Sequence, residues 1–140
     1  MLDLFIDGIA AIATPDTLAL MILGVIVGII FGSVPGLTAV TGIALFLPVT
    51  YSLGPIKGMA LLMAIYIGAV SGGLIAAILI NIPGTPASVA TCFDGTPLAR
   101  KGQAYKALGV GTVFSFLGTI FGILILVFVS PIIANFALKF

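Results

Sequence analysis

The chain has 140 residues, of which 61% are hydrophobic and only 6% are charged, and its mean hydropathy is +1.42. Soluble domains carry roughly a quarter charged residues, so this composition predicts an integral membrane protein. The net charge of +1 gives no attraction for nucleic acid, and the lack of histidine excludes a histidine metal site or proton relay. The one cysteine, Cys92, cannot form a disulfide within the chain and is expected to be a small buried residue.

Three segments without any charged residue set the number of membrane elements: 17–56, 58–93 and 107–138. One span needs about 20 apolar residues, so the first two segments are too long for a single helix and must break or turn. We therefore expect an all-α, polytopic membrane protein with discontinuous helices. It should have about three crossing helices plus one or two re-entrant or tight hairpins.

Residues 2–13 have apolar side chains at helical spacing, with Asp3 and Asp7 on the other face. This pattern predicts that residues 1–16 form an interfacial amphipathic segment, followed by a single transmembrane domain over 17–140. No Lys or Arg precedes Lys57, so no secretory signal peptide is expected.

Apolar runs predict membrane helices over 17–33, 37–54, 56–80 and 105–129, the last ending near Ser130-Pro131. Asp94-Gly95-Thr96-Pro97 is interpreted as a turn. Small residues that recur every four positions allow close helix packing. The first run has three glycines at this spacing, Gly24, Gly28 and Gly32, and Gly36 beyond it continues the spacing, which predicts one glycine face.

A Pro-Gly break follows a long apolar run twice, at Pro35-Gly36 and at Pro83-Gly84. Broken membrane helices often mark substrate or ion sites, because freed backbone groups must lie against protein or a wet cavity. Five nearby hydroxyl residues could add donors for a carboxylate or ligands for an ion: Thr38, Thr41, Thr85, Ser88 and Thr91. The alternative is a tight turn between packed helices. The two breaks also suggest a weak internal repeat around 28–50 and 76–98.

Two further polar residues lie close to the second break. Asn81 could present its amide to a carboxylate or its oxygen to Na⁺, and it suits a helix C-cap equally well. Asp94 is a candidate for proton coupling if it borders a pocket, although an Asp-Gly turn that faces water is the favoured interpretation.

Basic residues concentrate in cytoplasmic loops, and Arg100, Lys101 and Lys106 form the densest basic cluster. We therefore expect the loop 81–106 and the first Pro-Gly break to lie inside, with Lys57 and the N-terminus outside. In the alternative arrangement one or both breaks are re-entrant. The basic cluster could also attract an anionic substrate, but a role in topology is favoured.

Three ordered patches give the chain a resemblance to a known family. They are Gly28-Ile-Ile-Phe-Gly32-Ser-Val-Pro35-Gly36-Leu37, then Ile65-Tyr66-Ile-Gly68-Ala-Val-Ser-Gly72-Gly73 leading to Asn81-Ile-Pro83-Gly84-Thr85, and Thr91-Cys-Phe-Asp94-Gly95-Thr-Pro97-Leu-Ala99-Arg100-Lys101-Gly102-Gln-Ala104. With these patches the chain resembles the N-terminal part of the large membrane subunit of the tripartite tricarboxylate transporter family.

The resemblance implies a subunit of a secondary transporter for small di- and tricarboxylates in the lipid of a bacterial inner membrane. It implies an ion gradient of Na⁺ or H⁺ as the driving force and no cofactor. It also implies a small membrane subunit and an extracytoplasmic solute-binding protein as partners. Family large subunits are several times longer, so a further polypeptide or copies of this chain would complete the pathway.

Two other classes of function are an enzyme and a structural membrane protein. No histidine is present, and no pair of acids lies within the membrane segments, so an enzyme is not expected. The alternative function is a small glycine-zipper membrane scaffold or accessory subunit without transport activity of its own.

Overall fold

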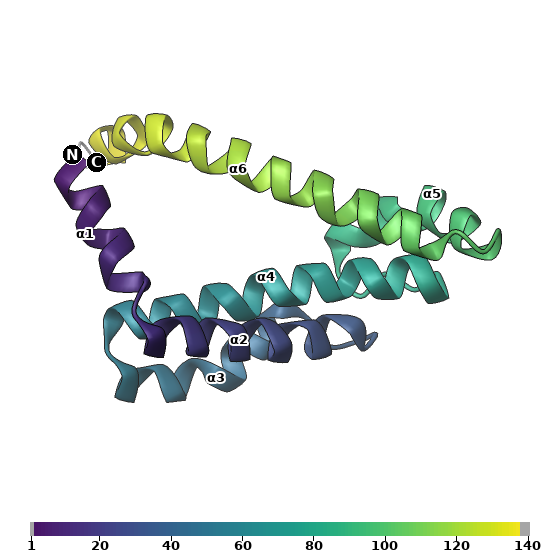
Figure 1. The fold of residues 1–140 in the computed structure, drawn as a ribbon, viewed down its shortest axis with the longest axis horizontal. Helices are drawn as coiled ribbons and strands as arrows, with labels where there is room; N and C mark the ends of the chain where they lie inside the picture. Colours follow the sequence, from purple (N-terminus) through teal and green to yellow (C-terminus); the bar gives the residue numbers. More distant parts are fainter. Residues whose placement is uncertain (1, 138–140) are drawn as a thin grey trace.

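The computed structural model describes residues 2–137, and this part of the chain folds entirely into helices and short connections. Figure 1 shows their arrangement. The elements are α1 (Leu2–Ile12), α2 (Pro15–Ser33), α3 (Ala39–Leu53), α4 (Pro55–Ile80), the 3₁₀ turn η1 (Pro86–Ser88), α5 (Val89–Arg100) and α6 (Ala104–Ala137).

Within residues 2–137, three helices are long and apolar enough to cross a membrane: α2, α4 and α6. Helix α3 has 15 residues and rises about 22 Å, which is less than the hydrocarbon core of about 30 Å. The all-α, polytopic fold class with three crossing helices and shorter hairpin elements is therefore confirmed. The interfacial position of the N-terminal segment and the weak internal repeat stay predictions.

Helices α2 and α4 run side by side in the same direction and are in backbone contact (Figure 1). A Cβ atom added at Gly28 would collide with the Ile65 carbonyl oxygen, and one at Gly68 would collide with the Val25 carbonyl oxygen. A Cβ atom added at Gly32 would likewise collide with the Ala69 carbonyl oxygen. We call this line of contact between the two helices the α2–α4 seam. The predicted close packing is therefore confirmed for this face, because only residues without a side chain fit there.

Gly36 does not continue this face, so that part of the prediction is wrong. It lies beyond the end of α2 with a φ of +96°, and nothing lies within 4 Å of the position a Cβ would occupy. Glycine is needed here for the left-handed backbone of the turn and not for packing.

Helix α3 returns along α4 in the opposite direction, since Gly42 packs near Ile65 while Thr50 packs near Gly58. Its N-terminus is capped by Thr38, whose hydroxyl accepts a hydrogen bond from the Thr41 backbone N–H at 3.4 Å. This brings the chain back to the start of α4, so that α2 and α4 can be parallel.

The predicted turn at Asp94–Pro97 is wrong, because these residues lie within helix α5. Two contacts with α4 hold the segment in the helix. A Cβ atom added at Gly95 would lie 2.7 Å from Cγ1 of Ile78, and the Thr96 hydroxyl donates to the Ala77 carbonyl oxygen at 2.9 Å. Tertiary packing here outweighs the local preference of Asp-Gly and Pro for turns.

Helix α6 extends further than expected, continuing through Pro131 to Ala137 and not ending near Ser130-Pro131. Its first turns pack on α4, where Gly111 faces Leu74, and beyond them the helix diverges from the other helices (Figure 1). The window that qualifies it as a span has no buried residue, so its apolar surface faces outward.

Candidate functional site

The second Pro-Gly break packs against the C-terminal end of α2. A Cβ atom at Gly84 would collide with the Gly32 carbonyl oxygen and would lie 3.0 Å from the Cα atom of Gly73. After α4 ends at Ile80, the chain therefore doubles back by about two helical turns, or about 10 Å, onto the C-terminal end of α2. The first break, Pro35-Gly36, follows that same end of α2.

The hydroxyl residues of the second break form a packed joint. Thr85 and Ser88 are only 7% and 5% exposed. The Ser88 hydroxyl donates to the Thr85 carbonyl oxygen at 2.8 Å. It also accepts from the Thr85 N–H at 3.3 Å, and this second bond is part of a capping box for η1. With Gly84 also buried, these residues pack into the junction of α2 and α4.

The remaining residues predicted for the site are distributed around this joint. Pro35 and Gly36 are exposed in the first turn, and Thr38 is half-buried as the cap of α3. Thr91 is half-buried and Asp94 is exposed, both on α5. The second break thus lies against the helix end that the first break follows, and these five residues do not border the cavity described next.

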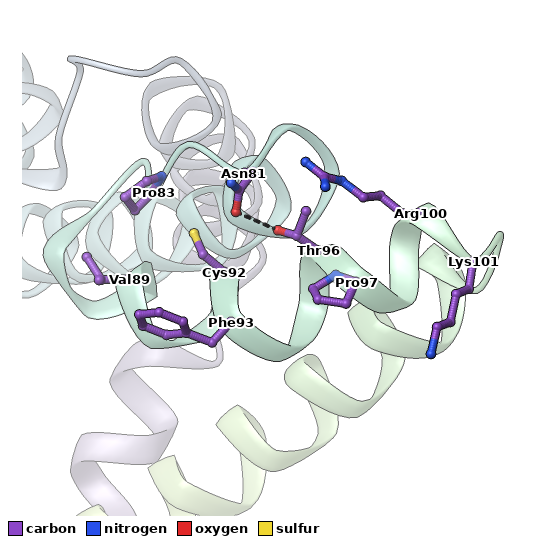
Figure 2. A pocket seen from close by; sticks show the side chains of 9 residues that line it. All are labelled: Asn81, Pro83, Val89, Cys92, Phe93, Thr96, Pro97, Arg100 and Lys101. Carbon is purple, nitrogen blue, oxygen red and sulfur yellow. Dashed lines mark hydrogen bonds between the residues drawn. The ribbon is translucent and has the colours of Figure 1, made fainter.

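A cavity of about 650 Å³ lies between helix α5 and the segment that follows α4 (Figure 2). We call it the α5 hollow. Two of the predicted site residues, Asn81 and Pro83, line it on one side. The α5 side and its end contribute Val89, Cys92, Phe93, Thr96, Pro97, Arg100 and Lys101.

Asn81 ends α4 in the left-handed conformation, with φ 58° and ψ 27°, which confirms the C-cap interpretation. Within the described residues it is the one non-glycine residue with positive φ. Asn tolerates this conformation better than most residues, because its short polar side chain can form local hydrogen bonds. The chain changes direction at this cap, and Asn81 and the following Pro83 line the hollow.

Thr96 connects α5 to Asn81 and to the end of α4. Thr96 is 5% exposed, and its hydroxyl donates to the Ala77 carbonyl oxygen at 2.9 Å. The same hydroxyl oxygen lies 3.0 Å from the side-chain oxygen of Asn81 (Figure 2). The carbonyls of the last helical turn lack intrahelical partners, so this hydroxyl satisfies one of them. A second hollow of about 260 Å³ lies beyond this contact and shares Asn81, Thr96 and Arg100 with the first.

The charged side chains of the α5 hollow are all positive. Arg100 and Lys101 lie at the C-terminal end of α5, where cations are favoured by the helix dipole. Figure 2 shows the guanidinium of Arg100 on the Asn81 side and the Lys101 ammonium on the other side. No acidic side chain lines either hollow among the described residues. Such a site is suited to an anion, because a guanidinium can bind a carboxylate with two parallel hydrogen bonds.

Sequence reasoning missed Thr96, Phe93 and the position of Cys92 in this site. Cys92 is half-buried on the wall of the hollow and is not the fully buried residue expected. The signal was present, because the lining residues of α5 recur at helical three- and four-residue spacing: Val89, Cys92, Phe93, Thr96, Pro97 and Arg100. The turn interpretation of Asp94–Pro97 concealed this pattern.

Comparison with known proteins identifies the family. Residues 18–140 match the tripartite tricarboxylate transporter TctA family. The chain belongs to this family. It is also 37% identical, over 143 aligned residues, to a protein of Agrobacterium vitis described as "Uncharacterized 52.8 kDa protein in TAR-I ttuC' 3'region". No solved structure matches the chain.

The family membership agrees with the resemblance given by the three sequence patches, and it supports a multi-pass membrane protein together with the three apolar spans. The match with the Agrobacterium vitis relative covers 100% of this chain but only 28% of that protein. This TctA family chain therefore spans less than a third of the length of the curated relative.

Proposed function

We propose that this chain is the N-terminal part of a transport subunit and that it binds small di- and tricarboxylates in the α5 hollow. The observation that carries the proposal is the charge of the hollow: Arg100 and Lys101 line it together with the Asn81 amide, and no described acidic side chain does. The family membership supports a carboxylate as the transported ligand, because the name of the family refers to tricarboxylates.

The residues of the hollow have complementary roles in this proposal. Arg100 binds one carboxylate as a planar fork, and Lys101 attracts the others as a mobile point charge. Asn81 and Thr96 provide the neutral polar wall between the two hollows. The joint at Gly84, Thr85 and Ser88 positions this wall relative to α2 and does not contact the ligand.

The wider mechanism forms part of the same proposal. An ion gradient of Na⁺ or H⁺ drives secondary transport, with no covalent catalysis and no cofactor. A small membrane subunit and an extracytoplasmic solute-binding protein act with this chain in a bacterial inner membrane. Further helices, from another polypeptide or from copies of this chain, cover the outward-facing apolar surface of α6, which has no buried residue in its span.

A glycine-packed scaffold remains the second candidate, and one observation favours it. Thr85 and Ser88 are buried at a filled joint, as expected for a break that only packs two helices together. The two candidates differ at the α5 hollow, because a scaffold has no need of two cations that line a cavity.

The deciding experiment measures equilibrium binding of radiolabelled citrate to native membrane vesicles that contain the chain with its natural partners. Arg100→Gln should weaken binding by about tenfold or more, since hydrogen bonds to charged groups contribute about 1.5–3 kcal/mol. Lys106→Gln is the matched control, because Lys106 is an exposed cation that lines neither hollow.

Equal affinities for the wild type and Arg100→Gln, at equal amounts of protein in the membrane, would remove the α5 hollow as the binding site. Equal losses in Arg100→Gln and Lys106→Gln would point to general electrostatic attraction and would also count against a specific site.

A further inference from the structure

The α5 wall of the hollow includes exposed apolar residues for which a small carboxylate has no matching part. We propose that an anionic phospholipid of the bilayer binds along this wall, with its phosphate at Lys101 and an acyl chain against Val89 and Phe93. The inference goes beyond the proposed function and does not rest on it, because it needs only the hollow and the membrane. The lipid takes the Lys101 side of the hollow, whereas Arg100 lies on the Asn81 side, next to the second hollow (Figure 2).

The first step places the hollow relative to the membrane. The ion pair between Lys57 and Asp16 marks one surface, because charged side chains are strongly unfavourable in the hydrocarbon core. Tyr51 is 84% exposed at the same end of α4, as expected for the aromatic belt of that surface. From Lys57 to Asn81, helix α4 rises about 36 Å, and the hydrocarbon core is about 30 Å thick. Asn81 therefore lies at the headgroup level of the opposite surface.

The second step follows α5 relative to the same surface. A Cβ atom added at Gly73 would lie 2.8 Å from the Thr85 hydroxyl oxygen, so the segment before α5 lies about 12 Å deeper than the end of α4. Near the other end of α5, Thr96 donates to a backbone carbonyl one turn further along α4. Helix α5 thus runs outward in the direction of α4, and its end at Lys101 reaches the headgroup level (Figure 1).

The third step is the order of polarity along α5. Val89, Phe93, Pro97 and Lys101 recur every four residues, and all four line the hollow. Figure 2 shows them in this order along the helix. At the deeper end, Val89 and Phe93 are 45% and 76% exposed. The row is therefore apolar within the hydrocarbon and positive at the headgroup level, which is the order of the acyl chain and the phosphate in a phospholipid.

The fourth step concerns the charge of the lipid. No acidic side chain of the described residues lines the hollow, so Arg100 and Lys101 attract a headgroup of net negative charge. The amine of a zwitterionic headgroup would meet these same two cations. Tyr105, which is 78% exposed in the first turn of α6, suits the same headgroup level. Basic pockets between membrane helices at this level are typical sites for anionic lipids.

The test measures which phospholipid the protein binds. The chain is purified in detergent with its natural partners and without any carboxylate ligand, and native mass spectrometry follows titrations with phosphatidylglycerol and phosphatidylethanolamine. The wild type should bind phosphatidylglycerol about fivefold or more tightly than phosphatidylethanolamine. Lys101→Gln should remove most of this preference. Lys106→Gln is the matched control and should keep it, because Lys106 is an exposed cation that lines neither hollow.

A second pair of variants tests the apolar part of the site. Phe93→Ser should weaken the binding of phosphatidylglycerol several-fold, because the acyl chain loses its contact with the ring. Phe121→Ser is the control, since Phe121 is 68% exposed on α6 and lines neither hollow. Glycerol 3-phosphate, which has the phosphate but no acyl chain, should not displace the lipid at equal concentration.

Three results would overturn the inference. Equal losses of preference in Lys101→Gln and Lys106→Gln would indicate a general attraction of anionic lipids to basic residues. Displacement by glycerol 3-phosphate at equal concentration would indicate a site for free phosphates. A wild type without preference would mean that another protein helix, and not a lipid, covers this wall. None of these results depends on citrate, so the proposed function is decided separately by Arg100→Gln.

Discussion

Gly84 lies against the carbonyl oxygen of Gly32, so the break after α4 is seated on the last turn of α2. The contact joins the end of α2 to the segment that follows α4, and it does so through backbone atoms alone. It also anchors the N-terminal end of α5, since η1 and α5 follow within a few residues. The α5 hollow therefore has one wall that is fixed directly to the α2–α4 pair.

Replacing Gly84 by alanine should destabilise the protein, because the new methyl group would collide with the Gly32 carbonyl oxygen. Overpacking of this kind costs about 1–3 kcal/mol. Gly122→Ala is the control, since nothing lies within 4 Å of the position of its Cβ. The thermal unfolding midpoint in detergent should fall for Gly84→Ala and stay or rise slightly for Gly122→Ala; equal midpoints would contradict the packed joint.

Asn81→Ala should also lower stability, for a different reason. The left-handed conformation at this position costs about 1–2 kcal/mol for a residue such as alanine. Asn81→Gly removes the same amide but accepts the backbone angles without strain. We expect the glycine variant to unfold at a higher temperature than the alanine variant. The reverse order would show that the amide contributes more than the backbone conformation.

Cys92 provides a probe for the charge of the hollow, because it is half-buried on the wall and is the one cysteine in the sequence. A negatively charged methanethiosulfonate should modify it several-fold faster than a positively charged reagent of similar size, since Arg100 and Lys101 attract anions. Lys101→Gln should reduce this difference, and citrate should slow both reactions. Equal rates for the two reagents would argue against an electropositive hollow.

At the opposite end of the helix pair, the ion pair between Lys57 and Asp16 should matter little. The charged atoms are 3.4 Å apart, but the side chains are 39% and 79% exposed. Exposed pairs contribute at most about 1 kcal/mol and are weakened by salt. Asp16→Asn should leave the unfolding midpoint nearly unchanged, and a large decrease would show that Asp16 has another partner.

Most of the fold could be predicted from the sequence, because the main signal is simple. Long uncharged runs predict α2, α4 and α6 to within a few residues at most of their ends. The exception is the end of α6, where Pro131 was expected to terminate the helix. A proline removes one hydrogen bond but does not by itself prevent the helix from continuing.

The candidate site was predictable only in part. Asn81 and Pro83 were expected near a binding site and do line the α5 hollow, whereas their role as ligands stays a prediction. Thr96 was missed because its role depends on Ala77 and Asn81, which lie on another helix. A local pattern such as Asp-Gly-Thr-Pro carries no information about such a partner. The pattern favours a turn, whereas packing of this segment on α4 stabilises a helix.

The seam between α2 and α4 limits the substitutions that this protein can accept during evolution. Where a side chain meets a side chain, an enlargement on one helix can be offset by a reduction on the other. At Gly28 and Gly68 the opposing atoms are backbone atoms, which no substitution can shrink. These positions thus lack second-site suppressors, and a selection for revertants of Gly28→Val should return glycine at the same codon.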